Sequence, residues 1–211
     1  MSTEYLKIFE AFAAAKRVNH YYWMHTDGDD HQHSTVSIEN IQKVIEIMVG
    51  ETIEKKTVLK SSRFHRAFVE RFNGGKENKI YVTKGEPLEW QRFSVVKELC
   101  HILIDKSDDF QADPCITIEG MTSEPGFFVE GSANETDSEQ LAEMIAMELI
   151  YPLEDRRADL ASEASFEQIA LNRCVPDKYV YRGLEQKHFE LCEKIWNLLP
   201  PVDPPNLNDK F

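Results

Sequence analysis

The chain has 211 residues, of which 42% are hydrophobic and 29% charged, so it is long enough to bury the core of one globular domain. Its 37 acidic residues outnumber its 24 basic residues and leave a net charge of −13, which argues against nucleic acid or anionic membrane as a main partner. The four cysteines have no C-x-x-C spacing, no signal peptide precedes them, and no apolar run approaches the roughly 20 residues of a membrane span. We therefore expect a soluble, cytoplasmic protein with reduced thiols.

Two helices are predicted in the first 50 residues. Apolar residues recur at helical spacing over residues 3–17, and again from Ser37 to a closing glycine at Gly50. The loop between the helices, within residues 25–33, carries three histidines and three aspartates. It could hold a metal, but it lacks the calcium-loop pattern of acidic residues with a fixed glycine and a closing glutamate. A solvated loop is the favoured interpretation.

From residue 56 the spacing of apolar residues changes towards two, which predicts strands. The predicted strands cover residues 57–59, 67–72 and 79–83, with two shorter candidates at 115–118 and 127–129. A turn at Gly74-Gly75 separates the second strand from the third.

The remaining predicted elements are helices, at residues 92–105, 137–150, 165–172 and 184–199. The proline-rich tail, residues 200–211, is expected to be extended or disordered. We expect a single domain over residues 1–199: a helical extension (1–50), a motif-bearing core (55–152) and C-terminal helices (153–199). The predicted fold class is α+β, with helices packed around a small, mostly antiparallel sheet.

The helix at residues 92–105 carries the pattern K-E-L-C-H. Lys97 and His101 are four residues apart, so their side chains share one helix face, with Glu98 beside them. In zinc peptidases of the H-E-x-x-H type, two imidazoles at these spacings bind the metal and the glutamate activates water. Here a lysine stands at the first position, so one metal ligand is missing.

A second pattern lies on the helix at residues 137–150. Glu139 shares a face with Ala142 and Ala146, and two small side chains let a neighbouring helix approach closely. A carboxylate at Glu139 could therefore reach a site on that neighbour. Such a carboxylate is the third ligand that a two-histidine helix needs, with the fourth position left for water.

Taken together, the two patterns resemble the ImmA/IrrE-type zinc metallopeptidases. Those proteins read roughly R-F-x-x-A-H-E-L-G-H-x-L and E-x-x-A-N-x-F-A-x-x-L-L-x-P. This chain reads Arg92-Phe93 into Lys97-Glu98-Leu99-Cys100-His101, then Glu139-x-x-Ala142-x-x-x-Ala146-x-x-Leu149-Ile150-x-Pro152. The similarity covers roughly residues 55–185 and implies a zincin-like fold. It would make Glu98 the general base and His101 and Glu139 zinc ligands, in a peptidase that cleaves repressor-type regulators in stress responses and mobile elements.

Lys97 changes the chemistry that this resemblance implies, because an ammonium group has no lone pair to offer a metal. We expect Lys97 to pair with Glu139, with His101 nearby and Glu143 as a further carboxylate of the site, and to replace zinc as the counter-ion. The expected function is then a degenerate homologue, without normal hydrolysis and with no cofactor, that binds a protein or peptide as a regulator. The alternative is an active zinc metallopeptidase with an altered metal site. No oligomeric state is predicted.

Other interpretations of the same residues remain open. Cys100 could substitute as a zinc ligand, although adjacent helix positions diverge by about 100° and would not face one metal without distortion. Glu139 could instead cap its own helix through a Thr136-x-x-Glu139 box, and His101 could be an ordinary buried core histidine.

Overall fold

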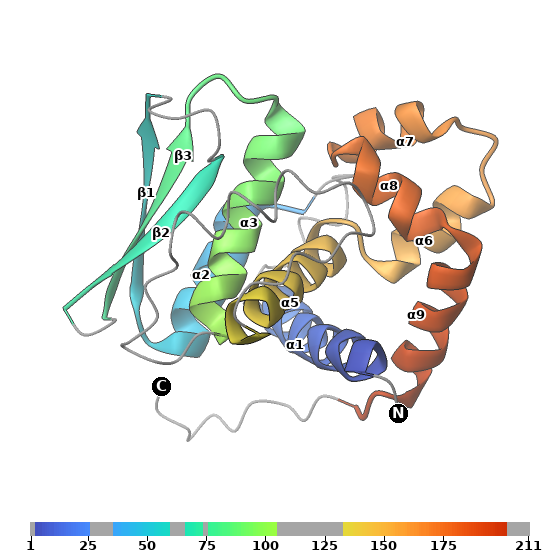
Figure 1. The fold of residues 1–211 in the computed structure, drawn as a ribbon, viewed down its shortest axis with the longest axis horizontal. Helices are drawn as coiled ribbons and strands as arrows, with labels where there is room; N and C mark the ends of the chain where they lie inside the picture. The colour runs from blue at the N-terminus through green and yellow to red at the C-terminus, as the bar shows by residue number, and fades with distance from the viewer. Residues whose placement is uncertain (1–2, 26–35, 60–65, 74–75, 105–132, 202–211) are drawn as a thin grey trace.

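The structure, a computed structural model, describes residues 3–25, 36–59, 66–73, 76–104 and 133–201, which form eight helices and three strands (Figure 1). In chain order they are α1 (Thr3–His25), α2 (Ile38–Val49), β1 (Thr52–Val58), β2 (Ala67–Phe72), β3 (Glu77–Thr83), α3 (Leu88–Ile104), α5 (Ala133–Ile150), α6 (Leu153–Leu160), α7 (Phe166–Arg173), α8 (Asp177–Leu184) and α9 (Gln186–Leu198). The α+β class is as expected.

The sheet is mixed rather than mostly antiparallel, which corrects the prediction. Its strand order is β1-β3-β2, with β2 antiparallel and β1 parallel to the central β3. The β2–β3 pair is the hairpin that the glycine turn predicts. Strand β1 is longer than predicted and pairs with the other side of β3. The alternation of apolar and polar residues can identify a strand, but it does not specify which strand lies beside it.

Helices α2 and α3 pack against the sheet, as Figure 1 shows: α3 contacts β2 and β3, and α2 contacts β1. The strands turn alternate residues towards these helices, so Ile53, Ile80 and Val82 are buried. On the outer face the partly buried rings of Phe68 and Tyr81 stack across the β2–β3 pair, with centroids 4.8 Å apart. The sheet therefore supports α3 from one side.

Helix α2 begins and ends where the sequence predicts. The Ser37 hydroxyl accepts a hydrogen bond from the backbone N–H of Asn40 at 3.3 Å, which satisfies one of the free donors of the first turn. Gly50 ends the helix in the left-handed conformation, with φ 73°, and donates its N–H to the Glu46 carbonyl at 2.9 Å.

Helices α1 and α5 complete the main core around α3. Helix α1 packs along α5 and continues to His25 rather than ending at residue 17, because Val18 and Tyr22 prolong its buried face. The N-terminal helices thus belong to the same core as the sheet and α3. Helix α5 begins at Ala133, so Thr136 lies inside the helix, and the alternative in which Thr136 and Glu139 form a capping box does not apply.

Some predictions fall outside the described residues: the strand candidates at 115–118 and 127–129, most of the histidine-rich loop, and the tail after residue 201. No bounds were predicted for helices α6 and α8, which lie within the expected C-terminal helices, residues 153–199. Within the described ranges Cys100, Cys174 and Cys192 are free thiols, as expected. No described helix has both the length and the apolar content needed to cross a membrane.

Candidate functional site

Helices α3 and α5 bring together the three residues that the two sequence patterns single out. The Lys97 Nζ lies 2.5 Å from Glu139 Oε2, and the His101 Nε2 lies 3.0 Å from Glu139 Oε1. The side chains of Lys97, Glu139 and His101 are 12%, 25% and 2% exposed, so these contacts form largely out of water. One carboxylate therefore joins both residues of the α3 face to the neighbouring helix.

The close approach of the two helices has a simple origin. Ala142 and Ala146 are fully buried on α5, and a methyl side chain at each position leaves little between the helix backbones. Lys97 and His101 are one turn apart on α3, so both point at the same stretch of α5. The spacing in each helix and the two small side chains together place Glu139 between them.

His101 is held at both ring nitrogens and at its backbone. Its Nδ1 lies 3.4 Å from the Ser138 hydroxyl, and its Nε2 faces the Glu139 carboxylate, with which a protonated imidazole would form an ion pair. The Arg71 guanidinium, from β2, donates to the carbonyl oxygen of His101 at 3.2 Å. A cation at the last turn of α3 also complements the helix dipole and ties the helix end to the sheet.

Charge pairing outweighs burial in this site. Burial by itself would raise the pKa of Glu139, but the hydrogen bond from His101 and the charge of Lys97 lower that pKa to about 2. Burial by itself would likewise lower the pKa of Lys97, but the carboxylates of Glu139 and Glu98 raise it above its usual value. At neutral pH the pair is therefore an ammonium and a carboxylate.

Glu98 and Cys100, on the same helix, are also buried. Glu98 stands where the peptidase pattern of the sequence analysis would have its general base. It is 5% exposed, and Cys100 is fully buried. Burial, reinforced by the charge of Glu98, raises the pKa of the Cys100 thiol far above its usual value. Cys100 is therefore a protonated thiol, and its position next to His101 in the helix directs it about 100° away from that imidazole.

Glu143, one turn beyond Glu139, belongs to an adjoining network. It accepts a hydrogen bond from the Tyr179 hydroxyl at 2.7 Å and lies 3.5 Å from the Lys178 ammonium. Lys178 also lies 5.1 Å from the centre of the Trp90 ring, which the Arg66 guanidinium covers at 3.6 Å. We call Arg66, Trp90 and Lys178 the aromatic–cationic rim.

The donor set around Glu139 does not fit zinc. A catalytic zinc site needs three protein ligands with lone pairs and an open position for water. Here the imidazole and the carboxylate can offer lone pairs, whereas Lys97 offers an ammonium whose charge already pairs with the carboxylate. Across the described ranges, no three His, Cys, Asp or Glu side chains group closely enough to hold a metal ion.

Several residues of the site were not predicted: Ser138, Tyr179 and the aromatic–cationic rim. The one sequence signal was the position of Ser138 immediately before Glu139. Rim residues come from three separate segments, so no local spacing connects them. No protein-family model matches this chain, and no curated protein or solved structure matches it either.

Proposed function

We propose that this chain is a degenerate relative of the ImmA/IrrE-type metallopeptidases, a cytoplasmic regulator that binds a protein or peptide without hydrolysing it. The observation that carries the proposal is the contact of Glu139 with both Lys97 and His101. In the resembling enzymes these positions surround a zinc ion. Here the lysine ammonium supplies positive charge in its place and keeps α3 and α5 together.

Loss of hydrolysis follows from the same substitution. In a zinc peptidase the metal lowers the pKa of a bound water, and the helix glutamate takes a proton from it. With two protein donors and an ammonium, the metal would be bound too weakly to remain. Glu98 is then a general base without a potent nucleophile to activate.

Two features next to the site favour a peptide as ligand. The aromatic–cationic rim contains a tryptophan and an arginine, residue types that are enriched where proteins bind one another. Strand β2 contacts α3 and forms one edge of the sheet within the described residues. An edge strand offers backbone donors and acceptors to which an extended peptide can add as a further strand.

The metal content of the purified protein tests the proposal that Lys97 has replaced zinc. The unmodified protein should purify without stoichiometric zinc, whereas Lys97→His should acquire one zinc per chain, measured by elemental analysis after dialysis. Lys97→Gln is the matched control, because it removes the charge without adding a ligand. Stoichiometric zinc in the unmodified protein that Glu139→Gln abolishes would support the alternative, an active metallopeptidase with an altered metal site.

Selection of binding peptides tests the proposal that the protein binds a peptide without hydrolysing it. Peptides selected on the unmodified protein from a displayed random library should bind and be recovered uncut by mass spectrometry. Lys178→Ala, at the rim, should weaken that binding more than Lys187→Ala, an exposed lysine on α9. Cleaved peptides, or equal effects of the two substitutions, would contradict binding at this site.

A further inference from the structure

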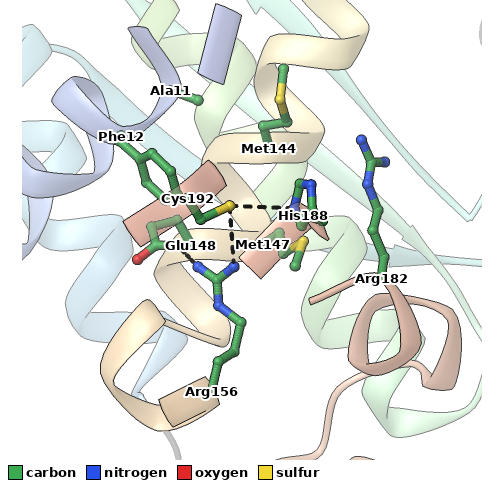
Figure 2. A pocket seen from close by; sticks show the side chains of 9 residues that line it. All are labelled: Ala11, Phe12, Met144, Met147, Glu148, Arg156, Arg182, His188 and Cys192. Atoms are coloured by element: carbon green, nitrogen blue, oxygen red, sulfur yellow. Dashed lines mark hydrogen bonds and ion pairs between the residues drawn. The ribbon is translucent and has the colours of Figure 1, made fainter. Parts of the chain in front are cut away.

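A second cluster of chemically active side chains lies between α1, α5, α6, α8 and α9, apart from the α3–α5 site. On α9, His188 and Cys192 are four residues apart and share one face, and the Cys192 Sγ lies 3.5 Å from the His188 Nε2 (Figure 2). They line a cavity of about 20 Å³, large enough for one water-sized particle. Two thioether side chains, Met144 and Met147 of α5, line the same cavity.

The spacing of the thiol and the imidazole suits two ligands of one metal ion. A sulfur about 2.3 Å and a nitrogen about 2.0 Å from the same ion, at a tetrahedral angle, lie about 3.5 Å apart. That separation is the one found between Cys192 and His188 without any rearrangement of α9. His188 is partly exposed and Arg182, which also lines the cavity, is exposed, so the cavity has a side towards solvent.

The ligand types favour a soft ion. Thiolate and thioether sulfurs select Cu(I), and imidazole also suits copper. The one carboxylate of the cavity is engaged elsewhere: Glu148 is ion-paired with Arg156 and accepts the backbone N–H of Leu153 at 2.9 Å. Hard cations, which prefer oxygen ligands, therefore find few free donors here.

The charges of the cavity favour a monovalent ion. The Arg156 guanidinium lies 3.8 Å from the Cys192 sulfur and is ion-paired with Glu148 (Figure 2). When an ion of charge +1 replaces the thiol proton, the net charge of this buried region does not change. A divalent ion would add a second positive charge near the Arg156 and Arg182 guanidinium groups that line the cavity, which is unfavourable in a partly buried region.

We propose that Cys192 and His188, with thioether sulfur from Met144 or Met147, form a binding site for one Cu(I) ion. Binding breaks the S–H bond of Cys192, forms a copper–sulfur bond and releases one proton, with no change in oxidation state. The proposal depends on the residues of α5 and α9 that line this cavity and is independent of the function proposed for the α3–α5 site.

The test is an anaerobic titration of the full chain with Cu(I) in competition with a chromogenic Cu(I) chelator, repeated with Ag(I), which does not change oxidation state. We expect one ion per chain and loss of binding in Cys192→Ser. In His188→Asn we expect at least tenfold weaker binding, because removing even a residue that only supports a metal ligand weakens metal binding by that factor. Cys174→Ser, which changes a thiol outside the cavity, should bind as the unmodified protein does.

Circular dichroism of each variant separates loss of the site from loss of the fold, and copper X-ray absorption identifies the ligands directly. Sulfur and nitrogen ligands together are expected in the unmodified protein. Unchanged affinity in a folded Cys192→Ser variant, tighter binding of Zn²⁺ than of Cu(I), or a first shell without sulfur would overturn the proposal.

Discussion

Removing the ammonium of Lys97 should loosen the contact between α3 and α5. Lys97→Met keeps an unbranched side chain of similar length, so it deletes the charge with little change of volume. Glu139 would then remain a mostly buried carboxylate with His101 as its remaining close partner. Removing one partner of a buried ion pair is strongly destabilising because the other charge is left uncompensated.

The size of this destabilisation can be worked out from the pKa of Glu139. Its fall from 4.5 to about 2 corresponds to about 3 kcal/mol of preference for the charged form, at about 1.4 kcal/mol per unit. His101 and Lys97 both contribute to this fall, against the opposing effect of burial. The hydrogen bond from His101 is the largest single cause that lowers the pKa, so Lys97 is assigned about half. This share predicts that Lys97→Met lowers the free energy of unfolding by about 1.5 kcal/mol at pH 7.

Urea denaturation at pH 7, followed by circular dichroism, measures this change. Lys97→Met and Glu139→Gln, made singly and together, form a double-mutant cycle that should return a coupling energy of about 1.5 kcal/mol. The matched control is Lys55→Met, which removes a lysine from an exposed ion pair with Glu39 and should cost less than about 1 kcal/mol. A Lys97→Met variant within experimental error of the unmodified protein would show that this pair does not stabilise the fold.

Three further outcomes can be checked by the same denaturation measurements. Because folding lowers the pKa of Glu139, its contribution of about 3 kcal/mol should be present above pH 4.5 and lost as the pH falls towards 2, a loss that Glu139→Gln should not show. Arg156→Met should cost about 3 kcal/mol at pH 7 because it removes the ion-pair partner of Glu148. Burial already raises the pKa of Glu148 to about 7, so without Arg156 this carboxyl should take up a proton, and the additional change Glu148→Gln should recover part of the loss. Gly183→Ala should cost about 1–3 kcal/mol, since its new methyl group would lie 2.9 Å from side-chain atoms of Arg156 and Met147; wild-type stability would show that those side chains move aside at no cost.

Local sequence signals predicted the elements that carry the α3–α5 site. Ser37 and Gly50 mark the ends of α2 because capping depends on a few neighbouring backbone groups. The spacing of Lys97 and His101 placed both on one face of α3, and the pairing of Lys97 with Glu139 was expected from the need to balance charge in a shared pocket. The family to which that pattern belongs remains a proposal.

Long-range features were not predictable in the same way. The parallel pairing of β1 with β3 joins strands separated by β2 in the chain, and alternation does not specify a partner. Tyr179 reaches Glu143 from α8, and the cavity around Cys192 is assembled from α1, α5, α6, α8 and α9. No local spacing encodes such contacts.

The sequence by itself determined which side chains share a helix face, because the helical repeat is a property of the backbone that every residue obeys. It also determined the central chemical fact of the α3–α5 site, that an ammonium rather than an imidazole stands at residue 97. The tertiary structure alone decided how far apart the helices lie and which charges leave water together. Those quantities depend on the packing of the whole core, since a carboxylate stays ionised in the interior only when a distant segment brings it a partner.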